Sequence, residues 1–182
     1  MDWRDLLGLL LLYTIPKKRL TPWQKAFTRL LSWLGEKHNM SIEEVQNEIV
    51  EEFSYLGDDR ESTIFYIMEL GQKLSPIDEN KKDENLIKGC QSKVWLTTEL
   101  VDNKIQFRAD SNTDITKGLI YLLIRVLNDR NPDDVVDADL SFIDRIGMSN
   151  VIGSQRSNGF ASMIKQMKLY ALAYKSKIEM NN

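Results

Sequence analysis

A single cysteine, Cys90, constrains what this chain can fold into and do more than any other residue. A lone cysteine is most often a small buried hydrophobe, and otherwise it is half of an intermolecular disulfide or a nucleophile. Gly89 directly before it favours a sharp turn of the backbone, and residues 94–98 (VWLTT) are typical of a strand. The sequence therefore predicts that Cys90 lies at a turn just ahead of a strand. Both the buried and the nucleophilic interpretation stay open at this point.

The rest of the composition excludes several kinds of cysteine chemistry. A cysteine hydrolase needs a base beside its thiol, and the only histidine, His38, lies in a segment that we expect outside the domain. One cysteine and one histidine are too few for a structural zinc site or for a cluster held by several thiolates, so we expect no metal site. The glycine-rich phosphate loops of nucleotide-binding proteins are missing from the sequence as well.

The overall composition is that of one globular domain. The chain has 182 residues, of which 42% are hydrophobic and 28% are charged. A net charge of -3 argues against a nucleic-acid-binding protein, which is usually basic. One cysteine cannot close an intramolecular disulfide, which fits a reducing compartment. We therefore expect a cytoplasmic protein without a nucleic-acid partner.

Residues 1–39 differ from the rest in charge, with seven Lys or Arg against three Asp or Glu. The apolar run Leu6–Ile15 has ten residues, whereas a membrane span needs about 20, and its flanking charges do not suit a secretory signal. An amphipathic pattern over residues 21–34 fits either a membrane-surface anchor or a segment outside the domain. We prefer the second interpretation and therefore expect no membrane partner. We expect Met40 to be the working start, residues 1–39 to be dispensable and the domain to cover residues 40–178.

The first part of this domain is predicted to be helical. Ser41 and Glu44 have the spacing of a capping box, so a helix is expected over residues 42–53. A second helix is expected over residues 60–74, with one helical turn over residues 84–88 leading into the cysteine.

A hairpin and more helices are predicted to follow. Residues 94–101 and 104–109 have the patterns of strands, and Asp102-Asn103 between them suits a tight turn. The next helix runs to about Asn128, with Ser111 or Asn112 as its cap, and it is apolar on most faces, so it should be the central buried helix. The remaining helices are expected over residues 132–138, 140–146 and 154–175.

The residues around Cys90 resemble the signature of the SufE family. The resemblance covers the run Asn85–Trp95 (NLIKGCQSKVW), and two further blocks follow in the family's order. One leads from Asp110-Ser111 to the TKGL of residues 116–119, and the other is Gln155–Gly159. The similarity extends from about Ile42 to Tyr174. An eleven-residue match with two ordered blocks is far more specific than a Gly-Cys pair.

The resemblance implies a fold and a function. SufE proteins have an α+β fold that is SufE/IscU-like, with a small curved antiparallel sheet packed against several helices. They accept sulfur from a cysteine desulfurase for iron–sulfur cluster assembly. Their cysteine lies at a loop tip, sheltered in an apolar cavity until the partner draws it out. The implied partners are a SufS-type desulfurase, which holds the PLP, and a SufBCD-type scaffold complex. The chain itself would hold no cofactor and would not be an enzyme.

The same resemblance assigns roles to residues. Cys90 is the expected persulfide acceptor. The residues expected to support it or to bind the partner are Gly89, Gln91, Ser92, Lys93, Asp110 and Arg156.

Two of these assignments have open alternatives. Lys88, Lys93 and Arg156 near Cys90 would favour the reactive thiolate, but the lysines can equally be solvated charges on a loop. Asp110 can equally be a cap at a strand end or helix start.

The sequence thus predicts a sulfur acceptor that stimulates a cysteine desulfurase, as a monomer or homodimer. The alternative is a non-catalytic adaptor whose Cys90 is only structural.

Overall fold

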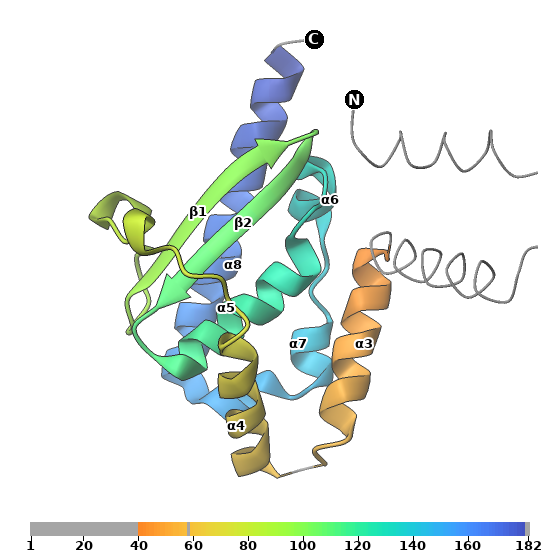
Figure 1. Ribbon diagram of the computed structural model, residues 1–182. Helices are drawn as coiled ribbons and strands as arrows, with labels where there is room; N and C mark the ends of the chain where they lie inside the picture. The colour runs from red at the N-terminus through yellow and green to blue at the C-terminus, as the bar shows by residue number, and fades with distance from the viewer. Residues whose placement is uncertain (1–39, 58, 181–182) are drawn as a thin grey trace, which may run out of the picture. The chain divides into compact units, whose positions relative to one another are not determined.

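The computed structural model describes residues 40–57 and 59–180, apart from the side chain of Gln155, and Figure 1 labels its elements. From Ser41 onwards the chain forms one compact unit. The predictions for residues 1–39, including the amphipathic segment, the surface-anchor alternative and the place of His38, lie outside the described residues. Within those residues, no helix is both long and apolar enough to cross a membrane.

The sheet is a single antiparallel hairpin of β1 (Val94–Val101) and β2 (Lys104–Ser111). Asp102 and Asn103 form its turn with positive φ angles of 50° and 60°, the conformation that two-residue hairpin turns require. One face of β2 is buried, as the alternating pattern predicts, through Ile105, Phe107 and Ala109. The hairpin is confirmed, and β2 extends two residues beyond its predicted end. Figure 1 shows helices gathered behind this hairpin.

The central helix is α5 (Asp114–Leu127), which contacts β2 and packs closely against α4 (Arg60–Gly71). Its core residues are almost entirely buried, as predicted: Leu119, Ile120, Leu122, Leu123, Val126 and Leu127. The close approach of the two helices depends on Gly118, where an added Cβ would lie 1.8 Å from the Ile67 carbonyl oxygen. Part of the second sequence block therefore has a packing role.

The start of α5 differs from the prediction. The residue that caps it is Thr113, and its side chain makes no capping hydrogen bond. Ser111 and Asn112 were expected to cap the helix, but their side chains bind the backbone of Lys93 instead. The two side chains therefore make hydrogen bonds to a segment distant in the sequence, and they do not cap the helix that follows them.

The first helix, α3 (Ile42–Ser54), begins as predicted. The Ser41 hydroxyl accepts from the Glu44 amide at 3.2 Å, and the Glu44 carboxylate accepts from the Ser41 amide at 2.7 Å. This reciprocal pair satisfies backbone donors that would otherwise lack partners at the helix start. The second helix, α4, ends three residues earlier than predicted.

Two short 3-10 turns, η1 (Asp78–Asn80) and η2 (Asp83–Asn85), follow α4 in the chain. The second replaces the helical turn that was predicted over residues 84–88.

An ion-pair network joins α3, α4 and α5. Arg125 donates to both carboxylate oxygens of Glu52 at 2.6 and 2.7 Å, and Glu48 lies 3.7 Å from the same guanidinium. Tyr66 also donates to Glu52, at 3.0 Å. Burial raises the pKa of Glu52, but the hydrogen bond and charge of Arg125 outweigh burial and hold that pKa below its usual value.

The C-terminal part consists of α6 (Pro132–Asp137), α7 (Phe142–Arg145) and α8 (Met148–Met180). The last helix was predicted to begin after a loop ending at Gly153. Helical structure instead begins at Met148 and is interrupted at Gly153, whose φ of 75° and ψ of 166° are not helical. Val151 and Ile152 are buried, so this short first segment is fixed by core packing that its sequence pattern does not reveal.

Candidate functional site

Cys90 lies near the tip of a short loop that precedes β1. The loop is closed at its base, where the Ile87 amide donates to the Val94 carbonyl at 2.8 Å and Leu86 forms a bridge with Trp95. Within it, Gly89 has a φ of +90°, which an L-amino acid rarely adopts. The prediction of a glycine-dependent turn just ahead of the strand is therefore confirmed.

The far side of the loop is tied to the end of β2. The Asn112 side-chain oxygen accepts from the Lys93 amide at 2.9 Å, and the Asn112 amide donates to the Lys93 carbonyl at 3.2 Å. The Ser111 hydroxyl donates to that same carbonyl at 2.8 Å. These three bonds fix the backbone of the loop where it enters β1.

A group of three hydroxyls lies beside this junction. Thr113 and Ser92 are 3.0 Å apart, Thr113 and Thr116 are 2.8 Å apart, and Thr116 and Ser92 are 3.2 Å apart, measured between hydroxyl oxygens. Ser92 was predicted as a supporting residue, and the structure places its side chain in this group. The group links the cysteine loop to the first turn of α5.

The side chain of Cys90 rests against α8. Its thiol donates to the Gly159 carbonyl, with a sulfur–oxygen distance of 3.3 Å. A Cβ at Gly159 would lie 3.7 Å from the sulfur, in ordinary van der Waals contact. A Cβ at Gly89 would lie only 2.9 Å from the Ser162 hydroxyl. The loop therefore approaches α8 closely at Gly159 and Ser162, where the helix side chains are small.

This position affects the chemistry of the thiol. Burial raises the pKa of the Cys90 thiol above its ordinary value, because a thiolate loses more solvation than a thiol. The hydrogen bond to Gly159 also favours the neutral form, which can donate while a thiolate cannot. None of the neighbouring cations is among the causes of this pKa shift, so in this conformation burial sets its direction and Cys90 lies half-buried against α8.

The other predicted loop residues are exposed around the thiol. Lys88, Gln91 and Lys93 are exposed, and so is Arg156 on α8. Arg156 precedes Gly159 by three residues, so the two lie on the same face of the helix, one turn apart. The structure thus brings Arg156 to the helix face on which Cys90 rests.

Asp110 has a different environment from the other predicted site residues. Its carboxylate lies 2.7 Å from the Lys81 ammonium and 3.5 Å from that of Lys117, and it accepts from the Ser111 amide at 2.7 Å. Burial raises the pKa of Asp110, but the bonds from Lys81 and Ser111 outweigh burial and lower it. Asp110 therefore ties the segment after α4 to the end of β2, as a carboxylate at a strand end.

Two residues of the site carried no predicted role. Gly159 stands in the C-terminal sequence block, which hinted at it, but its contact with Cys90 joins residues 69 positions apart. Ser162 lies beyond that block, and nothing in its local sequence distinguishes it. Among the described residues, no group of three or more His, Cys, Asp or Glu side chains is placed to hold a metal ion.

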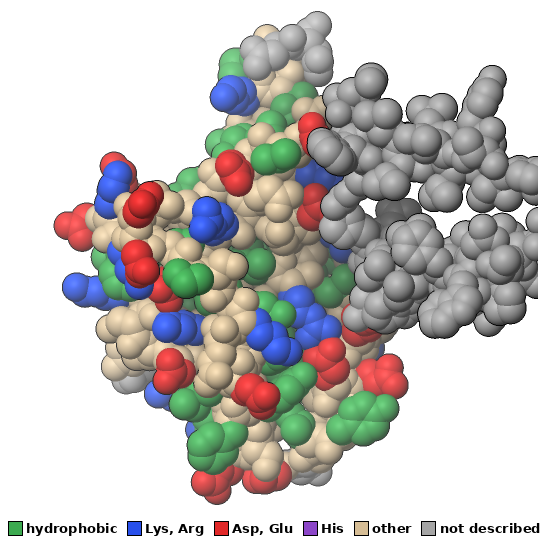
Figure 2. Space-filling view, viewed as in Figure 1, with side chains coloured by type: hydrophobic (Ala, Val, Ile, Leu, Met, Phe, Trp, Pro, Cys, Tyr) green, Lys and Arg blue, Asp and Glu red, His purple; other side chains and the backbone are tan. Residues whose placement is uncertain are grey.

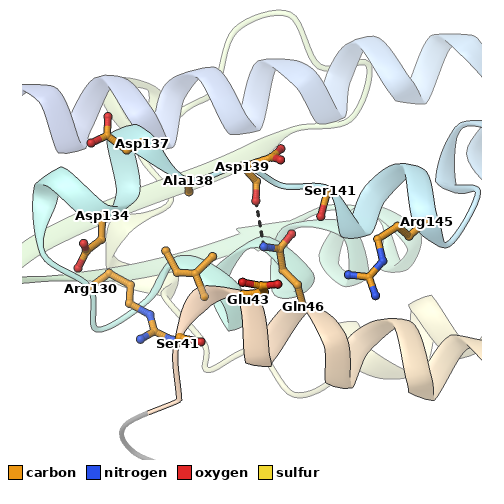
Figure 3. A pocket seen from close by; sticks show the side chains of 11 residues that line it. Ser41, Glu43, Gln46, Arg130, Asp134, Asp137, Ala138, Asp139, Ser141 and Arg145 are labelled. Carbon is orange, nitrogen blue, oxygen red and sulfur yellow. Dashed lines mark hydrogen bonds between the residues drawn. The ribbon is translucent and has the colours of Figure 1, made fainter.

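A cleft of the described domain lies apart from the thiol (Figure 3). It has a volume of about 630 Å³ and is lined by the start of α3, by Arg130 and by segments around α6 and α7. Gln46 lies in this cleft and donates to the Asp139 carbonyl at 2.9 Å. The lining residues include four carboxylates and two arginines and no cysteine. We assign no reaction to this cleft.

The fold and site define a class: an α+β domain that presents one thiol at the tip of a short loop. Residues 47–171 match the model of the SufE family, described as an Fe-S metabolism associated domain. The chain belongs to the SufE family.

Several relatives and one solved structure agree with this assignment. An uncharacterized SufE-like protein of Synechocystis sp. is 34% identical over 131 residues, which cover 70% of this chain and 80% of that protein. A SufE-like protein of Rhizobium meliloti is 30% identical over 67% of this chain and 91% of its own length. The solution structure of a hypothetical protein from Thermus thermophilus is similar with a TM-score of 0.61, over 72% of this chain and 96% of that one. Because the two sequences are only 15% identical, this structural similarity supports the fold and nothing further.

Proposed function

We propose that this protein is a sulfur acceptor that takes persulfide sulfur from a SufS-type cysteine desulfurase onto Cys90 and stimulates that enzyme. It then passes the sulfur to a SufBCD-type scaffold for cluster assembly. The observation that carries the proposal is the position of the chain's only cysteine, at the tip of a short loop and in contact with α8 through one hydrogen bond.

The reaction needs one thiol and no resident metal or cofactor. The Cys90 thiolate attacks the outer sulfur of the donor's persulfide, forming a new sulfur–sulfur bond as the donor's own sulfur–sulfur bond breaks. The bonding electron pair leaves with the donor cysteine as a thiolate, and the outer sulfur keeps its hydrogen. The proton that Cys90 gives up balances the donor thiolate. The PLP that first releases sulfur from free cysteine belongs to the desulfurase, so the acceptor is an accessory protein.

The loop must change position for this attack. In the structure the thiol is half-buried and bonded to Gly159, a state that lowers its reactivity because the thiolate is the nucleophile. Movement of the loop away from α8 would break that bond and return the sulfur to solvent or to the partner's site. Our candidates for contact with the partner lie in this loop or on the helix that it would leave: Gly89, Gln91, Ser92, Lys93 and Arg156. Asp110 has an indirect role, because it supports the strand end to which the loop is tied. We place the protein in the cytoplasm, as a monomer or homodimer.

A purely structural cysteine is the second candidate, because half-burial and a raised thiol pKa are also what a packed cysteine shows. In that case the protein would be a non-catalytic adaptor.

Replacing the thiol separates the two candidates. We expect Cys90→Ser to fold normally but to give no stimulation of a SufS-type desulfurase, since no second thiol can replace it. Desulfurase turnover with cysteine as substrate measures this, with circular dichroism as the check on folding. Full stimulation by Cys90→Ser would support the adaptor instead.

A further inference from the structure

We propose that Lys88, Lys93 and Arg156 form a cationic rim around Cys90 that docks an acidic surface surrounding the donor cysteine of the desulfurase. This inference rests on the proposed function and adds the chemistry by which the partner is recognised.

The three cations come from the loop that holds the thiol and from the helix against which the thiol rests. Lys88 and Lys93 stand two positions before and three positions after Cys90 in the loop. Arg156 lies on the face of α8 that includes Gly159, the residue to which the thiol donates. All three side chains are exposed, so they are accessible to a partner that binds the cysteine loop and the adjoining turn of α8.

Two of the segments that meet near the thiol, residues 85–98 and 145–178, are free of acidic residues, whereas the first turn of α5, which the loop also contacts, contains Asp114. Residues 85–98 and 145–178 contain eight Lys or Arg, and all 27 Asp and Glu of the chain lie elsewhere. These two segments therefore carry a net positive charge in a chain whose net charge is -3, and their basic residues that lie in the cysteine loop or one turn from Gly159 are Lys88, Lys93 and Arg156. On the face that Figure 2 shows, acidic and basic side chains are interspersed.

The fold itself makes no use of these three charges. Among residues 40–57 and 59–180, the side chains of Lys88, Lys93 and Arg156 form no ion pair or hydrogen bond. Other cations of the domain do, such as Lys81 and Lys117 with Asp110. A cation without an internal role is available for a partner.

These charges are also not among the causes of the pKa shift of the resting thiol. The pKa of Cys90 is raised, and burial is its cause. If cations are neither pairing within the fold nor stabilising the thiolate, their remaining effect is on the approach of another molecule. Complementary charge around a contact raises the association rate and orients the partners more than it adds to affinity once they are bound. The matching surface is therefore acidic.

Charge reversal at single positions tests this proposal. The variants are Lys88→Glu, Lys93→Glu and Arg156→Glu, with Lys177→Glu as the matched control. Lys177 is an exposed cation of the same helix, 21 positions beyond Arg156, which is about 30 Å along the axis. Each variant is titrated against a SufS-type desulfurase with cysteine as substrate, at low salt and at about 0.5 M salt, where the screening length falls to a few ångströms.

We expect each rim reversal to raise the half-saturating concentration about three- to tenfold at low salt, with the difference shrinking at high salt. The maximal stimulation should stay unchanged, and Lys177→Glu should match the wild type. Alkylation of Cys90 by iodoacetamide, an uncharged reagent, should proceed at the wild-type rate in every variant. The glutamine variants of the same residues should show smaller shifts in the same direction.

Three outcomes would overturn the proposal. Half-saturating concentrations that do not change, or that change equally in Lys177→Glu, would show that the rim does not dock the partner. Altered alkylation in the rim variants would show that the cations tune the thiol instead. A wild-type protein that accepts no sulfur would refute both this inference and the proposed function, whereas the first two outcomes leave the function intact.

Discussion

Two arginines of this domain have opposite environments. Arg125 has only 21% of its side chain exposed and binds Glu52 through both of its terminal nitrogens, with Glu48 nearby. Arg156 is exposed on α8 and has no ion-pair partner among the described residues. The charge of Arg125 is paired within the fold and therefore contributes to stability. The charge of Arg156 is unpaired among the described residues and is therefore available to a partner.

The largest expected effect comes from removing the paired arginine. Arg125→Ala should lower the free energy of unfolding by about 2 kcal/mol, less than for a fully buried pair because Glu52 is partly exposed. For a domain of this size, that corresponds to a fall in Tm of roughly 4–8 °C. Thermal unfolding measures it.

The matched variant for this comparison is Arg156→Ala. It should change the free energy of unfolding by no more than about 0.5 kcal/mol while raising the concentration needed for half-maximal stimulation of the desulfurase. If Arg156→Ala destabilised the domain as much as Arg125→Ala and left sulfur transfer intact, the division between the two arginines would be wrong.

The next effect concerns the close contact of the loop with α8. Gly89→Ala should destabilise the domain by about 1–2 kcal/mol, because its φ of +90° is strained for alanine and its Cβ would meet the Ser162 hydroxyl at 2.9 Å. It should also displace the loop and speed alkylation of Cys90. Unfolding and alkylation rates are the measurements.

Two controls separate strain from collision. Gly147→Ala carries a similar positive φ of 62° with nothing within 4 Å of its Cβ, so it should be destabilised without any change at the thiol. Adding Ser162→Ala to Gly89→Ala should restore part of the lost stability. No recovery in the double variant would mean that the contact with Ser162 is unimportant.

The smallest expected effect is in the pH dependence of the thiol. Since burial raises the pKa of Cys90, the pH midpoint of alkylation in the folded protein should lie above about 8.5, the value of a free thiol. The folded state then binds its proton more tightly than the unfolded state. This contribution to stability is therefore complete below the unfolded pKa and is lost as the pH rises through the folded pKa. Cys90→Ser should lack that loss, and a midpoint below about 8.5 in the wild type would restore the idea that the cations activate the thiol.

Local signals made the hairpin, the capping box and the central helix predictable. Asp102 and Asn103 are residues that tolerate the positive φ angles of a tight turn. The sequence of α5 is apolar on most faces of the helix, which is typical of a helix buried in the core. The site was predictable only in part. The position of Cys90 at a loop tip followed from Gly89 and the strand after it, but its contact with Gly159 depends on tertiary packing across 69 positions. For the same reason, the bonds of Ser111 and Asn112 to Lys93, and the ion pairs of Asp110, could not be read from neighbouring residues.

The central claim, that Cys90 accepts sulfur, is tested most directly by intact mass. The protein is incubated with a SufS-type desulfurase and cysteine, and its mass is then measured without reductant and again after reduction. The account predicts a gain of roughly 32 Da for each sulfur atom, located on the peptide that contains Cys90, removed by reduction and missing in Cys90→Ser. An unchanged mass in the wild type, under conditions in which the desulfurase is active, would contradict it.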